Sequence, residues 1–236
     1  MEPKRLTIRI GKEKVSAVLH LPAKKRSNIG VITAHGAGND MENPLLVDFS
    51  MGLAAAGWPA LRFNFPYKEK GLKAPDSQKI LEETWAAAFE AFRNDPDAGV
   101  NHVIAAGKSM GGRVASQMAA EGKLRAEGLI FLGYPLHPAG DKTKIRDGHL
   151  YKIQVPMLFF AGTKDTLCDM DVLRGVLEKL SAPWRLEVIE GGDHSFKVPV
   201  STGIEESEIH GGIVKTTVRW FQDTFSDKSV GCSMPR

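Results

Sequence analysis

Short apolar runs alternate with longer amphipathic stretches from residue 29 to residue 224, and this alternation leaves few fold classes open. The runs that we expect to form strands are 29–34, 60–65, 101–106, 128–132, 157–161 and 186–190. The stretches with helical spacing are 45–56, 77–93, 110–121, 169–180 and 211–224. Strands that lack polar alternation are buried on both faces. Strand–helix alternation with short links is typical of a mostly parallel sheet with helices on both sides. The pattern therefore predicts an α/β fold.

The first residues follow a different pattern. Apolar and polar residues alternate over 6–10 and again over 15–21, and the turn-like segment GKEK separates the two runs. This arrangement predicts an N-terminal antiparallel hairpin. We expect a single domain over residues 1–225, followed by a polar tail over 226–236 that is frayed.

Composition excludes several classes of partner. Lysine and arginine number 31 against 28 aspartates and glutamates, a formal charge of +3, which provides no concentrated basic face for a nucleic acid. The longest stretches without a charged residue are 27–39, 49–61 and 128–140, and each is shorter than the ~18 residues that indicate a membrane span. We expect neither a nucleic acid nor a membrane as partner. Cys168 and Cys232 are the only cysteines, which favours a cytoplasmic location over a disulfide framework.

The strongest chemical signal is the pentapeptide GKSMG at 107–111. It fits G-x-S-x-G, and it lies between an expected strand and an expected helix, which is the context that a nucleophile elbow requires. Such a turn raises the serine hydroxyl above the carboxyl edge of the sheet, at the positive end of a helix. The pattern predicts Ser109 as a nucleophile, whereas the pentapeptide alone could be a glycine-rich turn.

A serine hydroxyl needs a base to take its proton, and an acid to orient that base. Of the seven histidines, only His194 follows the last expected strand in a short glycine-containing loop. Asp165 follows the strand at 157–161 by a short turn, which gives the chain order Ser, Asp, His that accompanies this elbow. Asp169 is better explained as a helix N-cap, and Asp193 is too near His194 in the sequence to orient it easily.

Acyl transfer also needs hydrogen-bond donors for the developing oxyanion. We expect the backbone N–H of Met110, which follows the nucleophile, to supply one donor. The loop after the strand at 29–34 reads HGAG and is similar to the H-G motif of esterases, so we expect Ala37 to supply the other, with His35 packed beneath. No C-x-x-C or H-x-x-x-H spacing occurs, and we expect neither a metal nor a cofactor.

Together these segments resemble the α/β-hydrolase superfamily, and more narrowly the testis-expressed protein thirty group of small hydrolases near the dienelactone-hydrolase branch. The segments that carry the resemblance are TAHGAG at 33–38, LRFNFPY at 61–67, GKSMGGR at 107–113, GYPLH at 133–137, GTKD at 162–165 and GGDHSF at 191–196. The resemblance implies a serine-hydrolase architecture but no particular substrate. Dienelactone hydrolase itself uses a cysteine where this chain has Ser109.

Ligands of such sheets lie outside the carboxyl ends of the strands. Residues that follow strands at this edge, and that we expect to line a substrate pocket, are Asn64, Tyr67, Tyr134, Leu136 and His137. Residues 133–156 are too few for a helical lid, which predicts an open site for small or extended substrates. Within that segment, Arg146, Asp147 and His149 are read as a structural polar cluster, because charges in loops usually pair at the surface.

The sequence therefore predicts an α/β-hydrolase fold without a lid domain. The expected function is a serine hydrolase that cleaves a small-molecule ester or thioester through an acyl-enzyme. A non-catalytic binding or scaffold protein of the same fold is the alternative, since fold alone does not establish function. The oligomeric state and the natural acyl and leaving groups stay open.

Overall fold

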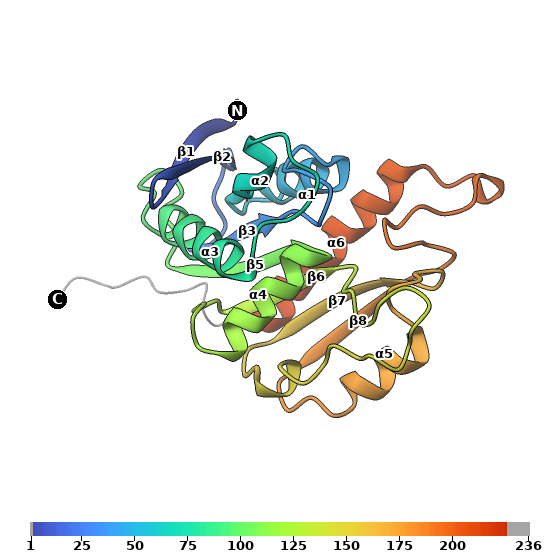
Figure 1. The fold of residues 1–236 in the computed structure, drawn as a ribbon. Coiled ribbons are helices and arrows are strands. Elements are labelled where there is room, and N and C mark those ends of the chain that lie inside the picture. The colour runs from blue at the N-terminus through green and yellow to red at the C-terminus, as the bar shows by residue number, and fades with distance from the viewer. Residues whose placement is uncertain (1, 226–236) are drawn as a thin grey trace.

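A computed structural model describes residues 2–225, and all of its strands join one eight-stranded sheet in the order β1-β2-β4-β3-β5-β6-β7-β8 (Figure 1). The strands are β1 (Lys4–Ile10), β2 (Glu13–His20), β3 (Ile29–Ala34), β4 (Ala60–Phe63), β5 (His102–Lys108), β6 (Gly128–Leu132), β7 (Met157–Gly162) and β8 (Trp184–Ile189). The helices are α1 (Pro44–Ala55), α2 (Pro66–Glu69), α3 (Gln78–Arg93), α4 (Met110–Ala120), α5 (Met170–Leu177) and α6 (Glu206–Phe225), with short 3-10 helices η1 (Leu150–Lys152) and η2 (Val200–Thr202).

The sheet is antiparallel at its N-terminal edge and parallel elsewhere. Strand β1 pairs antiparallel with β2, with Ile8 opposite Val15, and β2 pairs antiparallel with β4. All pairings from β4 through β3, β5, β6 and β7 to β8 are parallel. The predicted hairpin and the mostly parallel α/β sheet are both confirmed.

Two apolar layers cover the sheet, one on each face. Helices α3, α4 and α5 pack on one face, while α1 and α6 pack together on the other (Figure 1). Alternate residues of each central strand serve the two layers; Ile32 of β3 faces α3 and α4, whereas Val31 faces α1. Gly30 has no room for a side chain, because a Cβ there would lie 2.6 Å from Phe92. The five internal strands β3 to β7 are thus buried from both sides, as their sequences predict, whereas the edge strand β8 is only partly buried.

Some element boundaries differ from the expected ones. The apolar run over 60–65 predicts a strand of six residues, but β4 ends at Phe63 and the short helix α2 begins at Pro66. Helix α6 starts at Glu206 and continues through two glycines. The early start is supported by His210, whose Nδ1 lies 2.6 Å from the carboxylate of Asp48 on α1.

The segment between β6 and β7 holds no lid domain. Residues 133–156 form a loop whose one short helical turn is η1, so no helical domain covers the carboxyl edge of the sheet there. Within the described part of the chain, no helix combines the length and the apolar character that crossing a membrane requires. The frayed tail predicted over 226–236 lies outside the described residues.

Candidate active site

Ser109 occupies a strained turn between β5 and α4. Its backbone dihedrals are φ 50° and ψ −115°, a conformation that costs a residue with a side chain about 1–3 kcal/mol. Apart from glycines, Phe196 is the one other described residue with positive φ. Strain of this kind persists only where the surroundings enforce it. The turn places the serine at the first residue before α4, as the predicted elbow requires.

The two glycines of G-x-S-x-G are explained by close backbone approaches. A Cβ on Gly107 would lie 2.2 Å from the backbone nitrogen of Gly112, and a Cβ on Gly111 would lie 2.6 Å from the carbonyl oxygen of Ala34. Real Cβ atoms do not approach backbone so closely, so neither position accepts a larger residue without moving the turn. The motif is therefore a packing requirement of the strand–turn–helix junction.

The structure brings the three predicted side chains into one hydrogen-bonded chain. His194 Nε2 lies 2.8 Å from Ser109 Oγ, and His194 Nδ1 lies 2.7 Å from Asp165 Oδ2. Asp165 is buried, and its Oδ1 also accepts from the backbone N–H of Leu167 at 2.8 Å. A carboxylate can only accept, so Nδ1 carries the proton of the neutral imidazole and Nε2 is free to accept from the serine hydroxyl.

Tight contact between two loops makes this arrangement possible. A Cβ on Gly162, at the end of β7, would lie 2.1 Å from the carbonyl oxygen of Gly192. Lys164 N donates to the same oxygen at 2.9 Å, which ties the Asp165 turn to the His194 loop. Asp193 stabilises the His194 loop, because its Oδ1 accepts from the N–H groups of Ser195 at 2.7 Å and Lys197 at 2.9 Å.

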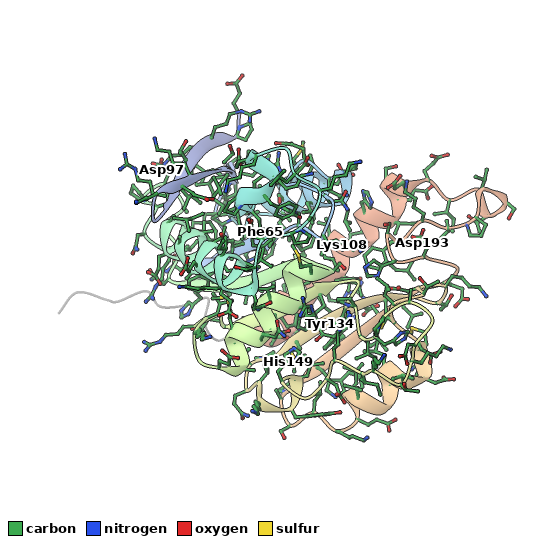
Figure 2. The ribbon with its side chains drawn as sticks, in the orientation of Figure 1. Phe65, Asp97, Lys108, Tyr134, His149 and Asp193 are labelled. Atoms are coloured by element: carbon green, nitrogen blue, oxygen red, sulfur yellow. The ribbon has the colours of Figure 1, made fainter. Side chains whose placement is uncertain are left out.

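Lys108, which sequence reasoning treated only as a spacer of the motif, has a structural task at this site. It is buried, and its Nζ donates to the carbonyl oxygen of His194. Figure 2 labels Lys108 and Asp193 next to each other, one from the end of β5 and the other from the loop after β8. Burial lowers the pKa of Lys108 to about 8, against the opposing charges of Asp165 and Asp193. The only signal in the sequence was a lysine within an otherwise small and apolar turn.

The predicted oxyanion loop lies directly beside the serine. A Cβ on Gly36 would be 3.2 Å from Ser109 Cβ, so the small residue allows the close approach. His35 is fully buried; its Nε2 accepts from Phe65 N at 3.1 Å, which leaves Nδ1 to donate to the carbonyl oxygen of Gly36 at 2.9 Å. Burial lowers the pKa of His35 to about 4, so the ring is neutral and supports the loop through these two hydrogen bonds.

A pocket of about 380 Å³ opens at Ser109. Its lining consists of Ala37, Pro75, Asp76, Gln78, Leu81, Ser109, Met110, Arg113, Pro135, Arg146 and Leu167. Both residues expected to supply oxyanion donors are included, and the N–H of Met110, at the first position of α4, has no acceptor within the helix. A larger hollow of about 800 Å³ beside 20–26 and α1 contains no member of the hydrogen-bonded chain.

The five residues predicted to line the substrate pocket do not line it; the structure gives them supporting positions. Tyr67, Tyr134, Leu136 and His137 are at most 1% exposed. Asn64 Oδ1 accepts from Met41 N at 2.8 Å. His137 Nε2 accepts from Asp169 N at 2.9 Å, and the Tyr67 hydroxyl donates to the carbonyl oxygen of Gly36 at 3.3 Å. These side chains follow the strands as expected, but they turn inward and hold the loops.

The polar cluster predicted over 146–149 divides in two. The ring of His149 lies beside Tyr134 (Figure 2), with Nε2 3.1 Å from the tyrosine hydroxyl and 2.8 Å from Ser116 Oγ of α4. Asp147 accepts from the hydroxyl of Tyr151 at 2.6 Å. These two groups are structural, as predicted, whereas Arg146 is among the residues that line the pocket beside Ser109.

Asp169 is confirmed as the N-cap of α5. Its Oδ1 accepts from Asp171 N at 3.0 Å and from Val172 N at 3.2 Å. The ion pair with Lys142 lowers the pKa of the Asp169 carboxyl, and the backbone N–H groups at the start of α5 lower it further. Between residues 2 and 225, no group of three or more histidine, cysteine, aspartate or glutamate side chains forms a ligand set for a metal.

The arrangement of the chain matches known proteins. The sequence pattern of the family described as "Alpha/beta hydrolase domain" matches residues 27–222. A dienelactone hydrolase from Anabaena variabilis is similar over 95% of this chain and 99% of its own, at 20% identity and a TM-score of 0.72. A serine hydrolase without a lid from Xanthomonas campestris covers 94% of this chain and 95% of its own, at 21% identity and a TM-score of 0.71.

A third similar structure is Est1E from Butyrivibrio proteoclasticus with ferulic acid bound, at 15% identity, a TM-score of 0.73, and coverage of 94% of this chain and 99% of its own. At such identities these structures establish the fold. The family match over most of the chain, the sheet order and the absence of a lid agree with one another. This chain belongs to the alpha/beta-hydrolase family.

Proposed function

We propose that the protein is a serine hydrolase that cleaves carboxylic esters or thioesters through an acyl-enzyme. The observation that carries the proposal is the chain of two short hydrogen bonds from Ser109 through His194 to Asp165, 2.8 and 2.7 Å long. Two further hydrogen bonds hold the chain in place, from Leu167 N to the carboxylate of Asp165 and from Lys108 Nζ to the carbonyl oxygen of His194.

In this mechanism Ser109 Oγ attacks the acyl carbon while its proton passes to His194 Nε2. The backbone N–H groups of Met110 and Ala37 receive the oxyanion. The carbon–oxygen or carbon–sulfur bond to the leaving group then breaks, and the leaving group takes the proton from His194. Water attacks the acyl-serine, gives its proton to His194, and Ser109 leaves with that proton as the acid is released. Asp165 stabilises the imidazolium in both halves and is not itself protonated.

The pocket supports a small acyl group. Its volume of about 380 Å³ is at the lower end of the range for ligand sites, and no lid covers it. We further propose membership of the testis-expressed protein thirty group, on the strength of the segments around Ser109 and His194, and a single domain over residues 1–225, supported by the one continuous sheet. The free buried thiol of Cys168 supports a reducing location such as the cytoplasm.

Labelling with a fluorophosphonate probe tests the proposal, since this reagent forms an adduct only with an activated serine. The expected result is one adduct on Ser109, which is lost in Ser109→Ala and slowed in His194→Gln. Ser116 is the matched control: its hydroxyl lies 2.8 Å from His149 Nε2 but donates to the carbonyl oxygen of Arg113, and no carboxylate among residues 2–225 is hydrogen-bonded to His149 Nδ1. Absence of an adduct in folded protein, together with no hydrolysis of p-nitrophenyl esters, would favour a binding or scaffold role.

A further inference from the structure

Two arginines beside the nucleophile have no carboxylate partner. Arg113 is partly buried and Arg146 is exposed, and both line the pocket that opens at Ser109. Within residues 2–225 their guanidinium groups make only two long hydrogen bonds, from Arg113 Nη1 to Gln117 Oε1 and from Arg146 Nη1 to the carbonyl oxygen of Pro135, each 3.4 Å. Arginines that lie together are normally balanced by acids, so this pair has unused donors.

The backbone holds both arginines in place. Arg113 lies one turn after Ser109 on the same face of α4, and its N–H donates to the carbonyl oxygen of Ser109 at 3.0 Å. Arg146 is held from both sides, because its N–H donates to the carbonyl oxygen of Leu136 at 2.7 Å and its own carbonyl oxygen accepts from the Tyr134 hydroxyl at 2.9 Å. These two hydrogen bonds fix the backbone of Arg146 beside the pocket.

The local electrostatics favour a bound anion. Burial, and in addition the charge of Arg146, lower the pKa of the Arg113 guanidinium, while Tyr134 opposes them. Asp76 is the one acid in the pocket lining, and its Oδ2 accepts from Tyr67 N at 2.9 Å rather than pairing with either arginine. Burial and Arg113 hold the pKa of the nearby His149 at about 4, so that ring adds no charge. The pocket lining thus carries two positive charges, from Arg113 and Arg146, and one negative charge, from Asp76.

The position of the pocket indicates which part of a substrate enters it. The leaving group must receive its proton from His194 Nε2, so it departs on the side of that ring. The pocket is lined by Ser109 and by the expected oxyanion donors, and none of the described residues of the His194 loop contributes to it. It therefore lies on the acyl side of the reacting bond.

We propose that Arg113 and Arg146 bind a carboxylate at the far end of the acyl chain, so that the preferred substrates are monoesters or monothioesters of short dicarboxylic acids. This inference rests on the proposed serine-hydrolase function. Ser109 and both arginines line one pocket of about 380 Å³, so the ester carbon and the free carboxylate of a short diacid would occupy the same small space. Two arginines and a carboxylate also match in geometry, because each guanidinium offers paired N–H donors.

Two substrates that differ only in charge test the inference. Mono-p-nitrophenyl glutarate carries a free carboxylate, and its methyl ester has the same chain without the charge; spontaneous hydrolysis of each is subtracted. The wild type is expected to show a higher kcat/KM for the charged substrate, and the ratio of the two values is the readout. Arg113→Gln and Arg146→Gln should each reduce that ratio by roughly 10-fold or more, the scale of a lost hydrogen bond to a charged group.

The matched control is Arg125→Gln, an exposed arginine just before β6, at the opposite edge of the sheet, which should leave the ratio unchanged. Raising the salt concentration should increase KM for the charged substrate more than for its methyl ester. Equal kcat/KM values for the two substrates in the wild type, or a ratio that neither arginine variant alters, would overturn the inference. An effect confined to substrates with a charged leaving group would also overturn it, because it would move the anion to the other side.

Failure of the inference and failure of the proposed function give different results. If Ser109 takes the fluorophosphonate label and the methyl ester is hydrolysed while charge makes no difference, only the inference is wrong. If the label is absent and neither substrate is hydrolysed, the proposed function has failed and the inference falls with it.

Discussion

Asp165 and Asp169 lie close together in the chain but have different hydrogen-bond partners, and a pair of variants separates them. The carboxylate of Asp165 is fully buried and holds His194 Nδ1 at 2.7 Å, whereas its other oxygen accepts from Leu167 N at 2.8 Å. In Asp165→Asn the amide oxygen can keep the Leu167 contact, which turns the NH₂ group toward the imidazole. The ring then accepts at Nδ1 and carries its proton on Nε2, so it cannot take the proton of Ser109.

The expected loss follows from this tautomer. In the general Ser-His-Asp template the same change lowers kcat by about 10⁴, which corresponds to roughly 5.5 kcal/mol of transition-state stabilisation. Asp165→Asn should approach this value with little change in the thermal midpoint, because shape and one hydrogen bond are retained. Asp169→Ala removes the two N-cap hydrogen bonds, 3.0 and 3.2 Å long, and should lower the free energy of unfolding by about 1 kcal/mol. For a chain of this size that is a decrease of roughly 2–4 °C in the midpoint.

The assay is the hydrolysis of p-nitrophenyl acetate together with the thermal midpoint, for both variants and the wild type in one buffer. Asp169→Ala should keep kcat close to the wild-type value at temperatures well below its midpoint. The rate of fluorophosphonate labelling provides a second readout, since it should fall in Asp165→Asn and stay unchanged in Asp169→Ala. Full activity in Asp165→Asn, with loss of activity and an unchanged midpoint in Asp169→Ala, would refute the assignment of the acid.

Three further predictions concern the pocket and its supports. Across p-nitrophenyl esters of neutral acids, kcat/KM should be highest for short acyl chains, and a steady rise with chain length would contradict a small open site. Lys108→Met removes the donor to His194 O and should lower kcat with little effect on KM. Because burial lowers the pKa of Lys108 to about 8, the unfolded chain holds this proton more tightly between pH 8 and 10.5, so Lys108 favours the folded state more as pH rises, whereas burial raises the pKa of Cys168 to about 12 and acts in the opposite direction. Denaturant titrations should therefore show that the stability of the wild type relative to Lys108→Met increases by about 3 kcal/mol over this window. Gly162→Ala places a Cβ 2.1 Å from Gly192 O and should abolish activity and reduce stability, whereas Gly175→Ala, with open space in α5, should raise the thermal midpoint slightly, and equal effects of the two would count against the loop contact.

Much of the fold follows from the sequence because its signals are local. Strands β3 and β6 begin and end at the expected residues, since an apolar run flanked by polar or turn residues carries both the strand and its limits. Strand β4 and helix α6 differ at their ends because the competing contacts, Phe65 N with His35 and His210 with Asp48, come from residues far away in the chain. Patterns within a short window do not contain such contacts.

The residue types of the candidate site were also readable, since G-x-S-x-G and the order Ser, Asp, His express backbone sterics and strand order. Which side chains face the pocket was decided by the tertiary structure. Tyr67, Tyr134 and His137 follow the expected strand ends, yet burial and hydrogen bonds turn them inward. Arg146 looked like an ordinary loop charge, and it reaches the pocket only because Leu136 and Tyr134 hold its backbone there. A sequence specifies which groups are available and at which edge of the sheet they emerge, whereas the direction of each side chain depends on partners that only the folded chain brings within hydrogen-bond distance.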